Sequence, residues 1–278
     1  MSYEVLNVLW KMWKSGPGTP SYATTVTVHQ LEAKDRAMVA NGMRLENLSV
    51  KNGHYFAVWQ PGTGGQHWQS GMSEAKFKQV SHEQAEAGRR LHCVSLDSGE
   101  LAAVWRDGTG TQQWQIGLPH DDFKKVDDKW AEQGLRIHSI SVDGGLIACC
   151  WRPGSGKYRW IANTSQAELR KTDTACTKEG LAMVQLAVDD DGLFNLNGNW
   201  IAVWSSPMAP TAWGIALGTS DFNQYITKMA AERSFLPIAI AGWQTQIGGD
   251  ETQGSAHGSR IPGVDPDTIL NDLVIHDG

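Results

Sequence analysis

The residues best suited to binding a ligand are tryptophans that recur in pairs, nine positions apart. Four such pairs lie along the chain: Trp59 and Trp68, Trp105 and Trp114, Trp151 and Trp160, and Trp204 and Trp213. An indole offers a broad apolar face and one N–H donor, which suits it to stack on a sugar or another flat ligand. The second tryptophan of each pair is therefore our candidate binding residue. Both members of a pair would serve equally well as hydrophobic core.

Polar residues that directly follow the first tryptophan extend these candidate sites. They are Gln60, Arg106 and Arg152. Hydrogen-bonding side chains beside an aromatic face are the usual composition of a small-molecule site. Copies of such a site in several repeats would bind multivalently, which favours a lectin-like protein. A solvated strand end explains the same polar residues without a ligand.

Lys11 is the one candidate for catalysis. It stands where four other repeats place a small residue that we expect to crowd toward the centre of the fold, namely Ala57, Ala103, Cys149 and Ala202. A buried amine with a lowered pKa can act as a nucleophile. A lysine whose amine reaches solvent explains the same residue. An enzyme with one asymmetric pocket near Lys11, of the cyclase or isomerase kind, is therefore the alternative to binding.

Histidine and cysteine spacing predicts neither a metal site nor a cofactor. His92 and His138 share one repeat position, but Glu46, Val184 and Pro237 fill that position elsewhere. A ring of histidine ligands is therefore not supported. The four cysteines show no CxxC spacing and are expected to be small buried thiols.

The aromatic spacing reveals an internal repeat. The first tryptophan recurs at Trp13, Trp59, Trp105, Trp151 and Trp204, at intervals of 46, 46, 46 and 53 residues. Periods in this range are typical of solenoids, propellers and arrays. Each repeat reads as two strands, a glycine-rich turn, a third strand with the second tryptophan, and a helix that ends at glycine. We predict an α+β, β-rich fold of β-β-β-α repeats.

Local signals place the boundaries of these elements. Ser73, Ser165 and Ser220 are suited to begin helices, and Gly88 and the glycines one period away from it are suited to end them. The glycine-rich segments, such as residues 62–65, predict tight hairpins between the second and third strands.

The two ends of the chain are predicted to meet. The first repeat lacks a leading strand, and the apolar run Phe235–Ala241 has no tryptophan unit after it. We predict that this run pairs with the strand holding Val8–Trp13, so that the C-terminal strand completes the first repeat. Five repeats would then close into a propeller-like toroid, which removes open sheet edges. Residues 1–243 would form this ring, and residues 244–278 a Gly/Ser-rich tail with a short helix at Asp267–Ile275.

Composition narrows the partners and the compartment. The formal net charge of −6 provides no basic face, so neither nucleic acid nor a membrane is expected as a partner. The N-terminus shows no basic leader followed by an apolar segment. We expect a cytoplasmic protein, or one exported without a classical signal peptide.

The repeats resemble a known family. The strand 102–105 ending in Trp105, then Trp114, Phe123 in a helix, and the run Gly134-Leu135-Arg136-Ile137, is similar to the bacterial tandem repeat modules attached to β-lactamase-like and polyglycine hydrolases. The likeness spans residues 1–243 and is more specific in the three middle repeats. The tyrosine that follows glycine in that family is replaced by Leu135 here, and we expect no hydrolase domain. The resemblance implies a repeat scaffold with a binding role.

Taken together, these patterns predict a ligand-binding, lectin-like protein without catalysis, which takes a carbohydrate or another small molecule at aromatic sites. A scaffold whose faces bind protein is a further alternative.

Overall fold

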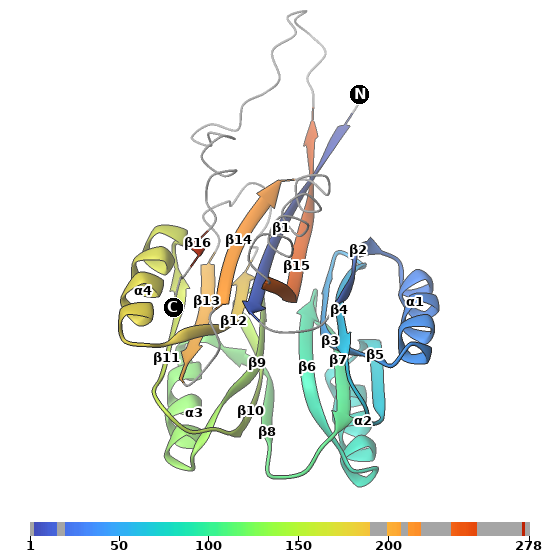
Figure 1. Cartoon of the computed structure of the whole chain (residues 1–278), viewed down its shortest axis with the longest axis horizontal. Helices are drawn as coiled ribbons and strands as arrows, with labels where there is room; N and C mark the ends of the chain where they lie inside the picture. Colours follow the sequence, from blue (N-terminus) through green and yellow to red (C-terminus); the bar gives the residue numbers. More distant parts are fainter. Residues whose placement is uncertain are drawn as a thin grey trace, which may run out of the picture.

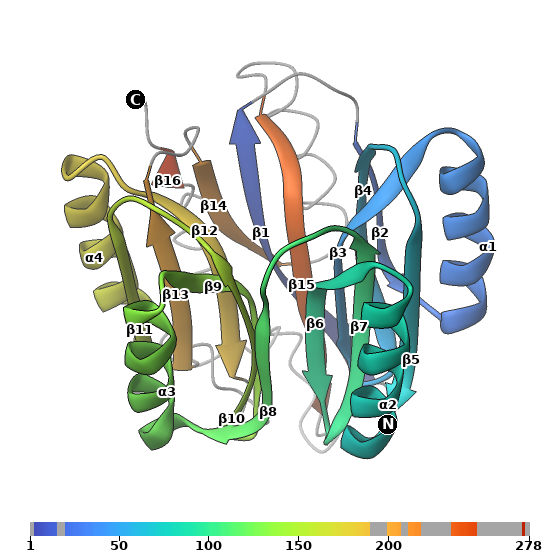
Figure 2. The ribbon, with the colours of Figure 1, turned by 90° about the horizontal axis from the view of Figure 1, so that it is seen from below.

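The computed structural model of the chain describes residues 3–15, 20–189, 199–206, 211–217, 235–248 and 274–275. Side chains are described for residues 20–189 and 199–206, and for Met12 and Trp213. Within these ranges the strands form five antiparallel sheets, and the helices α1–α4 lie on the outside of the sheets (Figure 1, Figure 2).

Four sheets share one plan, which in chain order is an outer strand, a helix, an inner strand and a central strand. Sheet 1 contains β2 (Ser21–Val26), α1 (Val28–Ala40), β3 (Met43–Lys51) and β4 (His54–Pro61). Sheet 2 contains β5 (Gln66–Met72), α2 (Glu74–Glu86), β6 (Arg89–Asp97) and β7 (Glu100–Asp107). Sheet 3 contains β8 (Gln113–Pro119), α3 (His120–Glu132), β9 (Leu135–Asp143) and β10 (Leu146–Pro153). Sheet 4 contains β11 (Tyr158–Thr164), α4 (Gln166–Lys178), β12 (Ala182–Asp189) and β13 (Asn199–Ser205).

The terminal sheet joins the two ends of the chain. Its central strand β1 (Tyr3–Ser15) pairs with β14 (Thr211–Leu217) on one side and with β15 (Phe235–Gly248) on the other, and β16 (Val274–Ile275) lies on the outer edge of β14. Trp13 pairs with Pro237 and Trp10 with Ala241, so the predicted pairing of these two segments is confirmed. The helix predicted to end at residue 275 lies mostly outside the described residues, and its last two residues form β16 instead.

The strand pairing corrects the predicted repeat unit. The glycine-rich residues 62–65 connect β4 of sheet 1 to β5 of sheet 2, so they cross between sheets and do not form a hairpin. The unit is therefore β-α-β-β, and the N-terminal β1 completes the last unit, whereas the sequence predicts that the C-terminal strand completes the first. A short glycine-rich link suits both connections, and only the packing of the sheets decides between them.

The true hairpins lie between the inner and central strands. Their turns are Asn52–Gly53, Ser98–Gly99 and Gly144–Gly145, and both residues of each turn have positive φ, between 51° and 80°. Two successive left-handed residues are the signature of a type I′ turn, whose twist matches that of the strands it joins.

The helices begin and end close to the predicted residues. The Ser73 hydroxyl accepts a hydrogen bond from the Lys76 amide, and Ser165 caps α4 in the same way. Gly88 and Gly180, two residues past the helix ends, have φ of 76°. That conformation is favourable for glycine, so these glycines stop the helices. The helix predicted to begin at Ser220 lies outside the described residues.

The central strands of sheets 1 to 4 have two buried faces, and sheets 2 to 4 stack through them. Ala57, in sheet 1, packs beneath α1 against Leu31. In sheet 2, Ala103 of β7 packs beneath α2, and its neighbour Val104, on the other face of β7, packs into the cluster that contains Ala57. The pattern recurs in the later sheets, and Met12 of β1 lies in the core of sheet 4. The small residues therefore face the helices, not the centre as predicted, because the helix side of each sheet is the crowded side.

The inner strands β3, β6, β9 and β12 lie side by side in sequence order, although no two belong to the same sheet. Side chains of each next strand satisfy the backbone N–H groups on the unpaired edge. Val50 N donates to Ser95 Oγ at 3.0 Å, and Val94 N donates to Ser139 Oγ at 3.0 Å. Leu96 N donates to Ser141 Oγ at 2.9 Å. These bonds connect sheets that share no backbone ladder.

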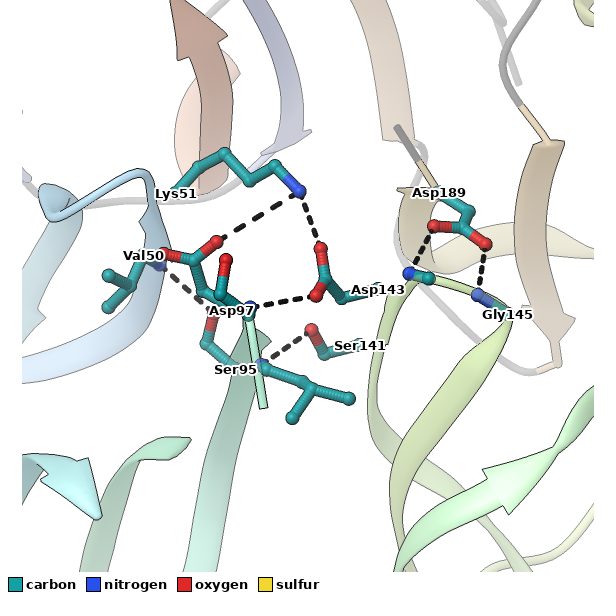
Figure 3. Close-up of polar contacts among 11 residues, drawn as sticks. Val50, Lys51, Ser95, Asp97, Ser141, Asp143, Gly145 and Asp189 are labelled. Carbon is teal, nitrogen blue, oxygen red and sulfur yellow. Dashed lines mark hydrogen bonds and ion pairs between the residues drawn. The ribbon is translucent and has the colours of Figure 1, made fainter. Parts of the chain in front are cut away.

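Charged groups make the same connection at the hairpin ends (Figure 3). The Asp189 carboxylate accepts from the Gly144 and Gly145 amides at 2.8 and 2.7 Å, and Asp143 accepts from the Ser98 amide at 2.7 Å. Lys51 stands at the equivalent position in sheet 1, and its amine lies 2.5 Å from Asp143 Oδ1 and 4.0 Å from Asp97 Oδ1. One lysine therefore links sheets 1, 2 and 3.

Among the described residues, no helix has the length and apolar character needed to cross a membrane.

Truncation tests the role of β15. Deleting the chain from Phe235 removes one of the two pairing partners of β1 and exposes a strand edge. We therefore expect the truncated chain either to lose cooperative unfolding or to form oligomers. Deleting from residue 249 keeps β15 and should lower the melting temperature much less. Thermal unfolding and size-exclusion chromatography measure both. A monomer truncated at Phe235 that melts like the full chain would show that the pairing contributes nothing.

Candidate functional site

Three of the four second tryptophans predicted to bind ligand have their N–H groups in structural hydrogen bonds, and the fourth, Trp114, packs edge-on against Phe77 of α2. Trp68 donates to Asp35 at 3.0 Å, Trp160 to Asp127 at 2.6 Å, and Trp213 to Asp173 at 2.7 Å. Trp213 is 1% exposed, and the other two are half-buried. These contacts give the three indoles a place in the core, and their binding of a ligand stays a prediction.

Gln60, Arg106 and Arg152 occupy one position, at the end of successive central strands. Each arginine reaches back to the inner strand of the preceding sheet. Arg106 Nη1 donates to Glu46 Oε2 at 2.9 Å, and Arg152 Nη2 donates to the Leu91 carbonyl at 2.6 Å. The structure therefore brings two of the three predicted polar residues into one cluster.

A β-bulge supplies the rest of this cluster. The register between inner and central strands shifts at Glu46, His92 and His138, so each of these residues is skipped in the pairing. A bulge re-aims the side chain of the extra residue, and bulges are common next to functional sites. In the terminal sheet the skipped residue is Ile238, which corrects the assignment of Pro237 to this position. We name Glu46, His92, Arg106, His138 and Arg152 the arginine–histidine cluster.

The groups of the cluster interact from sheet to sheet. His92 Nε2 lies 3.4 Å from Glu46 Oε2, and the rings of His92 and His138 are 5.5 Å apart at 64°. Burial raises the pKa of Glu46, but His92 and Arg106 outweigh it and lower that pKa to about 2. Burial lowers the pKa of His138 to about 3, and the charge of Arg152 acts in the same direction. At neutral pH Glu46 is therefore an anion and His138 is uncharged.

Arg152 and Arg106 donate to different kinds of hydrogen-bond acceptor. Where Arg106 finds the carboxylate of Glu46, Arg152 finds a backbone carbonyl, because the bulge residue of sheet 2 is His92. Its Nε is buried without a hydrogen-bond partner, as is Nε2 of His138. Burial lowers the pKa of Arg152, and nearby Arg90 and Arg106 add to that effect. The two unsatisfied nitrogens and the excess positive charge can accommodate the oxygens of an anionic group.

The described residues give no support to the other candidate sites, which are Lys11, a metal site and reactive cysteines. Lys11 pairs through its backbone with Gly214 and Ile240, and its side chain lies outside the described part of the chain. No group of three potential metal ligands occurs among the residues that the structure describes. Burial raises the pKa of Cys93 to about 11 and that of Cys150 to about 12, so both are inert buried thiols.

One signal in the sequence could have found the cluster. Glu46, His92 and His138 share a repeat position, and this mixture of acidic and imidazole side chains favours a polar cluster over a ring of metal ligands. Their proximity to Arg106 and Arg152 depends on how neighbouring sheets stack, which sequence spacing does not show.

A pH titration tests the environment of His138. A folded pKa of about 3 lies below the value of about 6.5 in the unfolded chain, so the unfolded state binds more protons between them. Stability should therefore fall as pH falls from 6.5 toward 3, with a slope of at most about 1.4 kcal/mol per pH unit from this group. His138→Val should show a shallower loss in urea unfolding between pH 6.5 and 5. Val184 occupies the same position in sheet 4, so the variant should fold, and equal slopes would contradict the assignment.

One model of a known protein family matches part of the chain. Residues 110–146 match a family model described as a polyglycine hydrolase-like structural repeat. No curated protein matches the chain. The match spans β8, α3 and β9 and stops at the first residue of β10, so it covers most of one β-α-β-β unit. The match confirms, for residues 110–146, the resemblance to bacterial tandem repeat modules.

Proposed function

We propose that the protein is a closed ring of five sheets that binds a small carboxylate-bearing ligand at the arginine–histidine cluster, with acidic sugars as the leading class. Binding, not catalysis, would be its activity. The two parts of the proposal, the ring and the ligand, rest on different observations.

Contacts at both sides of the terminal sheet support closure. Met12 of β1 packs into the core of sheet 4, just as the central strands of sheets 2 to 4 pack onto the sheet before them. On the other side, β15 lies against β3 and β4 of sheet 1. Each neighbour in the proposed ring thus touches the next. In a ring of this kind every sheet packs between two neighbours, which would explain why the first strand of the chain pairs with one of the last.

The single observation that carries the ligand is the incomplete pairing of Arg152. Its half-buried guanidinium lies beside neutral His138, with no contact to a carboxylate among the described residues. A guanidinium binds a carboxylate with two parallel hydrogen bonds, so a ligand carboxylate would complete what Glu46 completes for Arg106. Sugar hydroxyls would suit the remaining histidine and glutamate atoms.

An enzymatic role is less well supported. General acid–base catalysis at neutral pH needs groups with pKa values near 7. The pKa values of Glu46 and His138, about 2 and about 3, lie well below this range. The alternative around Lys11 remains a hypothesis about a side chain outside the described residues.

Titration with glucuronate, and with glucose as the neutral comparison, tests the ligand class. We expect calorimetry or NMR to show binding of glucuronate that weakens with added salt. Arg152→Gln should reduce the affinity about tenfold or more, because a hydrogen bond to a charged group is lost. Gln60 occupies this position in sheet 1, so glutamine is compatible with the fold.

Two matched variants make the test specific. His92→Glu should lower the affinity as much as Arg152→Gln, since it would supply Arg152 with an internal carboxylate. Arg106→Gln should lower it less, because Glu46 already occupies that guanidinium. Equal binding of glucose and glucuronate, or unchanged affinity in His92→Glu, would refute the assignment. Binding of both sugars that is lost in Trp160→Phe would instead support the aromatic sites.

A further inference from the structure

A carboxylate holds two tryptophans together in three of the four described repeats. It belongs to the eighth residue of each helix, which is Asp35 in α1, Asp127 in α3 and Asp173 in α4. One oxygen of each carboxylate accepts from the indole at the end of the central strand in its own sheet. The other oxygen accepts from the second tryptophan, on the following outer strand. The donor–acceptor distances are 2.8 and 3.0 Å at Asp35, 2.8 and 2.6 Å at Asp127, and 2.7 and 2.7 Å at Asp173.

The second repeat has lost this carboxylate. The eighth residue of α2 is Ser81, which is 3% exposed. Its hydroxyl has no hydrogen-bond partner, and neither has the indole N–H of Trp105, which is fully buried. The half-buried Trp114 likewise shows no hydrogen bond from its N–H to a described residue. Buried polar groups such as the Ser81 hydroxyl and the Trp105 N–H are nearly always satisfied in folded proteins, so their shared lack of a partner indicates a missing occupant.

The tryptophans nevertheless keep the arrangement seen where the carboxylate is present. Phe77 lies 5.8 Å from Trp105 at 35°, and the equivalent Phe123 lies 6.1 Å from Trp151 at 34°. Phe77 meets Trp114 edge-on at 5.1 Å, as Phe123 meets Trp160 at 4.8 Å. The space beside Ser81 therefore retains the shape of a carboxylate site, although its own side chain is shorter by two heavy atoms.

A fourth donor lies beside this space. Gln66, the first residue of β5, accepts through its side-chain oxygen from Leu45 N of sheet 1 at 2.8 Å, which leaves its nitrogen to donate to Asp35 at 2.9 Å. Gln112, one repeat later, accepts in the same way from Leu91 N of sheet 2 at 2.9 Å. The same orientation turns the Gln112 amide nitrogen toward Ser81, which is the residue equivalent to Asp35. Two indoles, an amide and a hydroxyl then surround the space, and no carboxylate among the described residues accepts a hydrogen bond from them.

We propose that this space is a binding site for one small monovalent anion of halide size. Indole and amide N–H groups only donate, and the hydroxyl can turn to donate as well. A halide accepts from all of them, whereas a water molecule in the same place would have two hydrogens of its own and only the serine oxygen to receive one. The anion would restore the negative charge that Asp35, Asp127 and Asp173 supply in the other repeats. We name this space the Ser81 site.

Bromide is the probe for the experiment, with gluconate, which is too large to enter, as the comparison anion at equal ionic strength. We expect crystals soaked in bromide to show an anomalous peak within hydrogen-bond distance of Trp105 Nε1. The melting temperature of the full chain should rise with bromide concentration by at least about 2 °C, as it does for a ligand that binds the folded state. A water molecule without anomalous signal, or equal melting in both anions, would overturn the proposal.

Two variants exchange the site between repeats. Ser81→Asp should melt higher than the natural chain in gluconate and should lose both the bromide peak and the bromide response. Asp127→Ser should gain a second bromide, beside Trp151, and a larger response. If that variant does not fold, Ser81→Asp and the soaked crystal still decide, because a bromide response retained in Ser81→Asp places the ion elsewhere. Arg152→Gln should keep the response, which separates the Ser81 site from the arginine–histidine cluster.

Discussion

The structure depends on how the backbone N–H groups of the inner strands are satisfied. Each inner strand is an edge strand of its own sheet, and an unpaired buried amide is costly. Hydroxyls one repeat further along accept these hydrogen bonds, as Ser95 does for Val50 and Ser139 does for Val94, and the Asp189 carboxylate accepts in the same way from Gly144 in the turn after β9. Because every acceptor belongs to the next sheet, the same bonds that protect an edge also fix the stacking of the sheets. The serines at these positions therefore hold the sheets together, as the buried tryptophans do.

Stacking the sheets buries both faces of the central strands of sheets 2 to 4, and this explains the composition of the repeat. One face lies beneath a helix and the other on the core of the preceding sheet, so residues such as Ala103 and Val104 are both fully buried. Tryptophan fills the volume between sheet and helix, and its N–H then needs an acceptor in an apolar setting. The aspartates of the helices provide it at the cost of a buried charge.

Two of the places where the repeats differ leave a polar group without a partner. His92, where sheet 1 has Glu46, leaves Arg152 without a carboxylate, and Ser81, where the three other helices have an aspartate, leaves the Trp105 N–H without an acceptor. Comparison of the sheets makes both differences visible, since Glu46 in sheet 1 and the three aspartates show the paired arrangement. In a fold of near-equal units, such departures are where specific binding can arise without disturbing the scaffold.

The sequence by itself determined the order of the elements within the four described repeats. The starts of α2 and α4 at Ser73 and Ser165, their ends before Gly88 and Gly180, and the pairing of Phe235–Ala241 with the first strand were correct. Those features follow from local rules of capping, periodicity and turn chemistry. Only the tertiary structure decided which strands share a sheet, because residues 62–65 suit a hairpin and a crossing equally well. It also decided that Glu46, His92 and Arg152 meet, since contacts between sheets arise from packing over 46 or more residues, which no local pattern records.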